Sequence, residues 1–146
     1  MPAYSATELR EAYELRPILD CAALTRAGLP APPLLQRLKA INDRFAKAPG
    51  VAARIELDDS FHLALVSRCG NDMLVRLIEQ TMARTRRYEF AYLAADETLM
   101  QSGEEHRRII AALEARDLPA AIAALRENLS SGLEPMLRWL KKHKLG

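Results

Sequence analysis

The chain has 146 residues, of which 49% are hydrophobic and 27% are charged, and its formal net charge at pH 7 is +2. This length and composition are typical of one globular domain that buries a hydrophobic core of its own. The small net charge gives no reason to expect a nucleic-acid or membrane partner, and no apolar run approaches the roughly 18 residues of a membrane span. The N-terminus lacks the basic and apolar regions of a signal peptide, so we expect a cytoplasmic protein.

The first half of the chain predicts three helices. The first opens at Ser5 with the capping box SATE, ends at Gly28 and contains Pro17, where we expect a kink or a local break. Apolar residues at helical spacing predict a second helix over about 33–46 and a third over about 51–69. Short segments rich in glycine and proline separate the three helices, so neighbouring helices should pack antiparallel.

The second half continues the pattern with three more helices. We expect the fourth over about 73–94 and the fifth over about 97–116, with a break near Gly103. The last should start at Asp117 and be bent or divided at Pro135. No segment predicts a strand. The sequence therefore predicts an all-α antiparallel bundle of six to seven helices.

Polar side chains lie on stripes that should otherwise be apolar. Asp58 and His62 are four residues apart, so they share the inward face of the third helix. His106 lies on the inward stripe of the fifth helix and Asn128 on that of the sixth. Burying such groups without partners would cost several kcal/mol. Either a divalent cation or a buried Asp–His hydrogen-bond network could satisfy them, and the spacing alone leaves both open.

Catalytic motifs are missing from the sequence. No glutamate stands three residues before a histidine, as the di-iron bundles require, and the zinc-protease motif H-E-x-x-H does not occur. No serine or cysteine has a histidine partner within its own segment. We therefore expect a protein that is not an enzyme.

Three segments carry a family resemblance. They are YELRPILDCAALTRA near the start, DDSFHLALVSRCGNDMLVRLIEQ in the middle and EEHRRIIAALEARDLPAAIAALRENL near the end. Together they resemble the FCD domain, the effector-binding and dimer-forming domain of the FadR subgroup of GntR-type bacterial transcription regulators. The resemblance covers about residues 5–130, with the segments in the family's order and at its spacing. It implies an all-α bundle of six or seven helices around a central cavity.

The resemblance also implies a metal site in that cavity. Many members of the family bind a divalent metal there through one aspartate and three histidines, which correspond here to Asp58, His62, His106 and, in place of the third histidine, Asn128. An amide oxygen is a weaker and harder ligand than imidazole. The site could hold Zn²⁺, Ni²⁺ or Mn²⁺ with Asn128 and water completing the shell. Alternatively, it has lost the metal and binds its effector by hydrogen bonds.

The implied function is the sensing of a small organic acid by a homodimer. Arg16 is the first candidate for binding the effector's carboxylate, although it could instead pair with a neighbouring acidic residue. Arg84 and Arg87 are weaker candidates, since each could be solvated or lie at an interface. The alternative function is a helical interaction or scaffold module in which Asp58 and the histidines form a purely structural network.

The resemblance finally suggests a domain division. Residues 1–9 would be a remnant of a linker and the start of the first helix, and residues 5–146 would form the FCD-like domain. GntR regulators carry a winged helix-turn-helix before this domain. We expect no such module in this chain, so DNA would be bound only through a module that the chain lacks.

Overall fold

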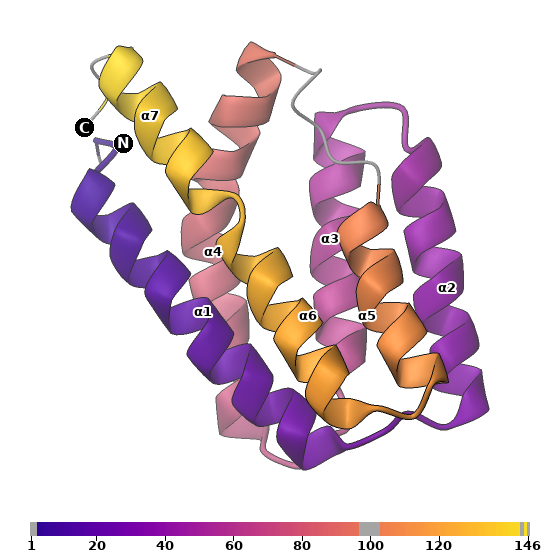
Figure 1. The fold of residues 1–146 in the computed structure, drawn as a ribbon. Coiled ribbons are helices and arrows are strands. Elements are labelled where there is room, and N and C mark those ends of the chain that lie inside the picture. The colour runs from indigo at the N-terminus through magenta and orange to yellow at the C-terminus, as the bar shows by residue number, and fades with distance from the viewer. Residues whose placement is uncertain (1–2, 97–102, 144, 146) are drawn as a thin grey trace.

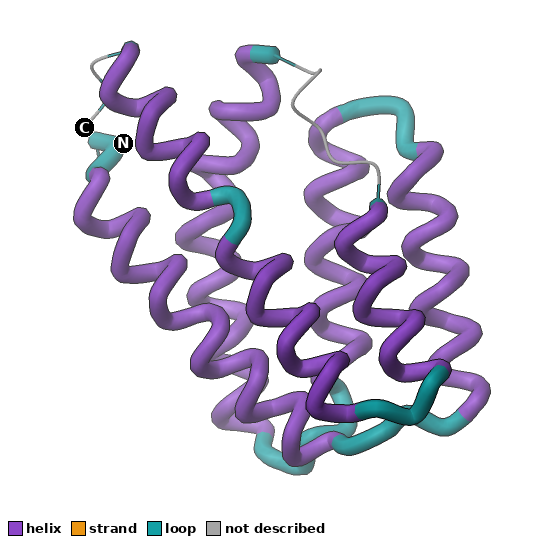
Figure 2. Tube along the Cα trace, viewed as in Figure 1, coloured by secondary structure: helices purple, strands orange, loops and turns teal. Residues whose placement is uncertain are grey.

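The fold was obtained as a computed structural model that describes residues 3–96, 103–143 and 145. Within these residues the chain forms seven helices and no strand, as the sequence predicted (Figures 1 and 2). The helices are α1 (Ala6–Ala27), α2 (Pro32–Lys47), α3 (Val51–Val66), α4 (Asp72–Ala95), α5 (Glu104–Glu114), α6 (Leu118–Ser130) and α7 (Leu133–Lys142). None of the described helices combines the length and the apolar character that crossing a membrane requires.

Side-chain caps fix the starts of three helices at the predicted places. The Ser5 hydroxyl accepts a hydrogen bond from the Glu8 backbone N–H at 3.1 Å. Asn71 caps α4 by accepting from the N–H of Leu74, and Asp117 caps α6 in the same way. Each cap satisfies one of the N–H groups that have no partner within the helix.

Two features of the described helices differ from the prediction. The first helix is continuous across Pro17, so no break forms there; its packing against α4 and α6 offsets the missing backbone hydrogen bond. The third helix ends at Val66 rather than Cys69, where the Ser67 hydroxyl donates to the Ala64 carbonyl at 2.9 Å. The start of the predicted fifth helix, 97–102, lies outside the described residues.

The last predicted helix is divided into two. The division falls at Ser131 and Gly132, and Pro135 lies in the first turn of α7. Proline is tolerated in a first turn because the N–H groups there have no partner within the helix. The predicted division is therefore confirmed, with the break placed one turn before the proline.

The helices pack as neighbouring antiparallel pairs. Helix α1 packs on α4 and α6, α2 packs on α3 and α5, and α5 lies beside α6 (Figure 1). The main apolar core draws on α1 to α6 and includes Leu24, Phe61, Ile78, Ile109 and Leu125. A smaller apolar cluster joins the N-terminal end of α1 to α4 and α7 through Leu9, Tyr88, Met136 and Leu140.

Candidate functional site

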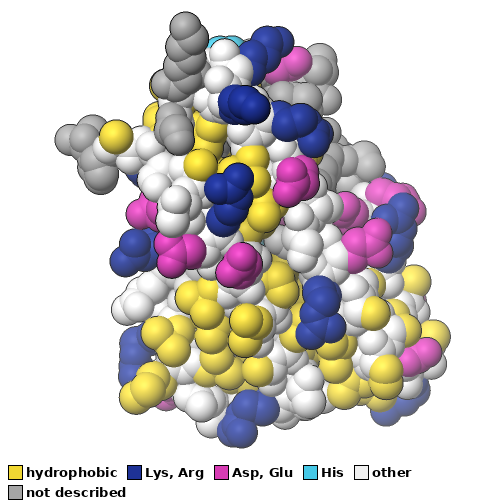
Figure 3. Space-filling view, turned by 60° about the vertical axis from the view of Figure 1, so that its left-hand side comes forward, with side chains coloured by type: hydrophobic (Ala, Val, Ile, Leu, Met, Phe, Trp, Pro, Cys, Tyr) yellow, Lys and Arg dark blue, Asp and Glu magenta, His cyan; other side chains and the backbone are white. Residues whose placement is uncertain are grey.

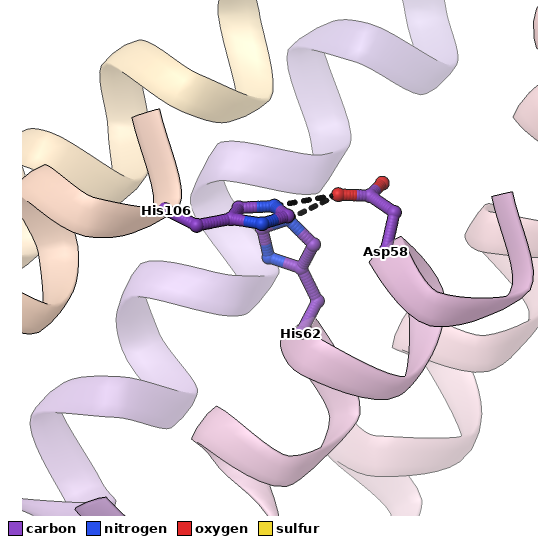
Figure 4. A group of neighbouring side chains, drawn as sticks. All are labelled: Asp58, His62 and His106. Carbon is purple, nitrogen blue, oxygen red and sulfur yellow. Dashed lines mark hydrogen bonds and ion pairs between the residues drawn. The ribbon is translucent and has the colours of Figure 1, made fainter. Parts of the chain in front are cut away.

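Asp58, His62 and His106 meet inside the bundle. The Asp58 Oδ1 atom lies 2.7 Å from His106 Nε2 and 3.4 Å from His62 Nε2. Figure 4 shows the carboxylate of α3 directed at both rings, one from its own helix and one from α5. One ligand atom from each residue lies within 4.8 Å of the other two. The sequence therefore predicted this convergence correctly from three separated positions.

His106 is held in one orientation by a neighbour on α2. Its Nδ1 atom lies 2.9 Å from Asn42 Oδ1, and the Asn42 amide nitrogen donates to the Gly103 carbonyl at 3.2 Å. The Gly103 contact fixes which end of the amide is the oxygen, so Nδ1 must donate its proton to Asn42. The second nitrogen, Nε2, therefore faces Asp58. A proton or a cation between these two atoms is what allows them to lie 2.7 Å apart.

Gly103 is required where α5 begins. Its φ of 92° is in the left-handed region, and a Cβ atom there would lie 2.8 Å from Asn42 Oδ1. A side chain would therefore be strained in its backbone and would displace the amide that orients His106. The ring of Phe61 stacks on the ring of His106, with 4.1 Å between the two centroids.

The three residues form a strongly coupled charge cluster. Burial alone would raise the pKa of Asp58, but the neighbouring His62 and His106 hold the pKa of this carboxyl far below its ordinary value. Asp58 is therefore ionised throughout the physiological range. Both histidines are 2% exposed, so the negative charge faces nitrogen atoms that water reaches poorly. Such a group offers the carboxylate and imidazole ligands that divalent transition metals prefer.

This centre opens on a cavity of about 140 Å³ between the helices. Asp58, His62 and Asn128 line it, whereas His106 lies behind them. The other lining residues come from six helices and are Tyr13, Arg16, Phe45, Arg54, Ile55, Thr85, Glu89, Tyr92, Leu93, Leu129, Gly132 and Met136. Asn128, which the resemblance placed at a metal ligand's position, therefore does share the cavity.

Two buried atoms of cavity-lining residues have no hydrogen-bond partner among the described residues. They are His62 Nδ1 and Asn128 Oδ1. The other end of the Asn128 amide is occupied, because Nδ2 donates to Glu105 Oε1 at 2.7 Å. An unpaired buried polar atom costs about 1–3 kcal/mol. Asn128 Oδ1 offers a lone pair to a cation or a hydrogen-bond donor in the cavity, whereas His62 Nδ1 carries the ring proton when Nε2 binds a metal. The residues present therefore fit a divalent metal.

The predicted effector-binding arginines lie in different places. Arg16 lines the cavity, but its guanidinium already pairs with Asp20 through two hydrogen bonds of 3.0 and 3.2 Å. Arg84 is an exposed residue 3.6 Å from Glu8. Arg87 donates to the Ala3 carbonyl at 2.9 Å. The structure thus brings only Arg16 to the cavity, in the paired form that the sequence left open.

Two charged cavity residues and the residue that orients His106 were not predicted from the sequence. Arg54 and Glu89 line the cavity, and Asn42 holds His106. A signal existed for Arg54, because it stands four residues before Asp58 and so extends the same helical face. Asn42 interrupts the apolar stripe of α2 between Leu38 and Phe45, which is the same kind of signal that identified His106.

Glu89 is a second cavity carboxyl with a shifted pKa, and its shift is opposite to that of Asp58. Burial, followed by the charges of Asp58 and Asp59, raises its pKa to about 7. Tyr13 donates to Glu89 Oε1 at 3.5 Å, and burial together with this carboxylate raises the tyrosine pKa well above its ordinary value. Near neutral pH the cavity therefore contains one carboxyl that is firmly ionised and one that is partly protonated.

Comparisons with known proteins agree with this architecture. A crystal structure of a GntR-family transcriptional regulator from Pseudomonas syringae pv. tomato str. DC3000 has a TM-score of 0.86 and 22% sequence identity, over 97% of this chain and 60% of that protein. E. coli McbR/YncC has a TM-score of 0.74 and 22% identity, over 91% of this chain and 67% of that protein. These likenesses show a shared fold. The chain spans 60% and 67% of the lengths of these two proteins.

Sequence comparison identifies the family. No curated protein is significantly similar to this chain. The sequence profile of the FCD domain, however, matches residues 11–131, which include all of α2 to α6 and every residue of the Asp–His centre. The chain therefore belongs to the FCD domain family.

Proposed function

We propose that this domain senses a small carboxylate for a GntR-type transcription regulator, with the effector bound in the cavity beside a divalent metal. The observation that carries the proposal is the meeting of Asp58 and His62, which line the cavity, with His106, which lies behind them. A buried cluster of this kind is costly to a fold unless it is paired. A ligand in the cavity would also supply a partner for the unpaired oxygen of Asn128.

Each residue at this centre has a different role. Asp58 supplies the negative charge, and Asn42 holds His106 so that Nε2 faces the carboxylate. Asn128 lines the same cavity, and its amide oxygen has no hydrogen-bond partner among the described residues. A divalent metal held by Asp58, His62 and His106 would bind a carboxylate oxygen of the effector as a Lewis acid. Zn²⁺, Ni²⁺ and Mn²⁺ all suit a set of imidazole and carboxylate ligands.

The alternative is an interaction module with a structural Asp–His network. One observation favours it, because the 2.7 Å contact between His106 and Asp58 is a good hydrogen bond without any metal. A structural network, however, gives no role to the cavity or to the unpaired atoms of His62 and Asn128. The sensor therefore accounts for more of the site.

Thermal unfolding distinguishes the two functions. The protein is stripped with a chelator and melted alone, with a divalent metal, and with metal plus a panel of small carboxylates. A sensor is stabilised by about 2.7 kcal/mol when the ligand is at 100 times its Kd, whereas a structural module shows no shift with any of them. In Asp58→Asn the metal-dependent shift should disappear.

A neighbouring carboxylate provides the matched control. Asp59 is the next residue on α3, but it pairs with Arg86 at 2.7 Å and does not line the cavity. Asp59→Asn should therefore keep the metal-dependent shift of the wild type. Metal stabilisation that survives in Asp58→Asn would reject the centre as the metal site.

We further propose a homodimer, with DNA bound through a winged helix-turn-helix module that precedes this domain in the regulator. An exposed apolar patch on neighbouring parts of α1 and α4 is the interface. It contains Leu15, Ile18, Met73 and Leu77, which are 43% to 66% exposed. Figure 3 shows apolar side chains gathered low on the face that comes forward when the α1 side is turned to the viewer. Exposed apolar groups of this kind mark protein interfaces.

The oligomeric state tests this interface. Ile18, 64% exposed, is the most exposed of the α1 pair, so Ile18→Asp should turn a dimer into a monomer in light scattering. Phe90→Asp is the control, because Phe90 is also exposed on α4 but lies more than three turns beyond Leu77. A wild type that is monomeric at high concentration would reject the interface.

A further inference from the structure

Arg54 is a buried cation on the cavity wall without an anionic partner. Its side chain lines the cavity and the residue is only 8% exposed. The guanidinium lies over the ring of Phe45, 4.4 Å from the centroid. No carboxylate among the described residues forms an ion pair or a hydrogen bond with it, and burial lowers its pKa. No Arg54 nitrogen is among the fully buried polar atoms that lack a partner, so its N–H groups remain accessible to an anion in the cavity.

Arg16 lines the same cavity, but its positive charge is already paired. Its guanidinium is paired with Asp20 and also faces the charges of Asp58 and Glu89. An incoming carboxylate at Arg16 would therefore compete with groups that are already present. At Arg54 it would meet no competitor. The two arginines thus have different roles, although both line the cavity.

The spacing of Arg54 and Asp58 on α3 sets the distance between the guanidinium and the Asp–His centre. Arg54 precedes Asp58 by four residues on α3, so the two lie on one face about one helical turn, or roughly 5–6 Å, apart. Phe45 occupies a face of the guanidinium, and stacking of this kind leaves the N–H groups at its edge available for hydrogen bonds. Those donors match the geometry of a carboxylate.

We propose that Arg54 is the anion-recognition residue of the cavity and that the effector is a short dicarboxylate. One carboxylate lies at the Asp58–His62–His106 centre and the other pairs with the guanidinium of Arg54. This assignment rests on the proposed carboxylate-sensing function and narrows it to a chemical class. A monocarboxylate at the centre leaves Arg54 buried without an anion, whereas a dicarboxylate of about four or five carbons can reach both groups.

The charge balance supports the same class. A divalent cation with Asp58 as its only anionic ligand has a net charge of one positive unit, and Arg54 adds another. When Glu89 is protonated, a dianion neutralises the two together, and a monoanion leaves one charge uncompensated. The cavity of about 140 Å³ has room for a ligand of this size.

Titration calorimetry with matched acids tests the proposal. Succinate and butyrate have the same number of carbons and differ in one carboxylate. Each is titrated into the protein with one equivalent of Zn²⁺ and again with a chelator. We expect the wild type to bind succinate about tenfold or more tightly than butyrate, because a charge-assisted hydrogen-bond pair is worth at least that factor. Arg54→Met should lose this preference while its affinity for butyrate stays within about threefold.

Two further variants keep the test decisive. Arg54→Lys retains the charge but loses the two-pronged geometry, so it should keep part of the preference, and it serves if Arg54→Met does not fold. Arg37→Met removes an exposed arginine of α2 and should change nothing. An equal affinity of the wild type for both acids, or a preference that survives in Arg54→Met, would overturn the role of Arg54. Failure of both acids to bind the wild type would overturn the carboxylate sensor itself.

Discussion

The two halves of the bundle are built differently, although the same helices run through both. In the main core α1 contributes Leu24, α3 contributes Leu65 and α4 contributes Ile78, all of them buried apolar residues. Two to three turns away, these helices turn polar side chains to the cavity. Helix α1 presents Tyr13 and Arg16, α3 presents Arg54 and Asp58, and α4 presents Thr85 and Glu89.

This difference separates stability from recognition within each helix. Close-packed apolar side chains account for most of the folding free energy, so the core half can hold the helices in place on its own. The cavity half can then keep groups that are costly to bury, such as an ionised carboxylate and an unpaired arginine. Substitutions in the core half should therefore lower stability without changing ligand binding, whereas those in the cavity half should change ligand binding and leave stability equal or higher.

The largest expected effect is the truncation of a core side chain. Leu125 on α6 is completely buried in the main core, so Leu125→Ala should lower the free energy of unfolding by about 3 kcal/mol. Urea denaturation measures this loss. At a temperature where the variant is folded, its affinity for metal should equal that of the wild type. A large loss of metal affinity together with the loss of stability would show that the two halves are not separable.

A smaller effect with a clear pH dependence is expected at Glu89. Its pKa is about 7 in the folded protein, against 4.5 for an ordinary glutamate. The raised pKa means that the unfolded chain ionises this group more easily, so the fold is penalised as the pH rises from about 4.5 and fully penalised above 7. Glu89→Gln removes the penalty. The variant should be more stable than the wild type by on the order of 2 kcal/mol at pH 8 and equally stable near pH 4.

Thermal melts across this pH range check the sign at Glu89. Glu79→Gln, an exposed glutamate on the same helix, is the control and should follow the wild type at every pH. A Glu89→Gln variant that is less stable than the wild type at pH 8 would mean that the ionised carboxylate is paired in the cavity. Recognition would then extend to a cationic group of the ligand.

The sequence was a good guide to the core half. Helical periodicity and caps such as Ser5 and Asn71 depend on neighbouring residues only, so the existence and order of the helices could be predicted from local patterns. The end of α3 and the continuity of α1 across Pro17 were missed. Both depend on hydrogen bonds and packing that the periodicity does not contain.

The cavity half was predictable only in part. Asp58 and His62 share a face at four-residue spacing, and His106 stands on an otherwise apolar stripe, so each could be found within its own helix. Arg54 was missed because an arginine in the first turns of a helix is usually exposed. Its burial depends on Phe45 of α2, a contact between helices. Asn42 orients His106 through another contact between helices, formed by residues much farther apart in the sequence.

The smallest expected effect concerns the residue that departs from the family's ligand set. Asn128 lines the cavity with an unpaired Oδ1, so Asn128→His would place an imidazole where the family has its third histidine. A fourth strong ligand should raise metal affinity about tenfold or more, close to 1.4 kcal/mol, which a competing chelator measures. Glu127→His adds an exposed histidine one position earlier on α6 and should leave the affinity unchanged. An equal affinity in Asn128→His and the wild type would place residue 128 beyond the reach of the metal, because imidazole outcompetes an amide wherever both can bind.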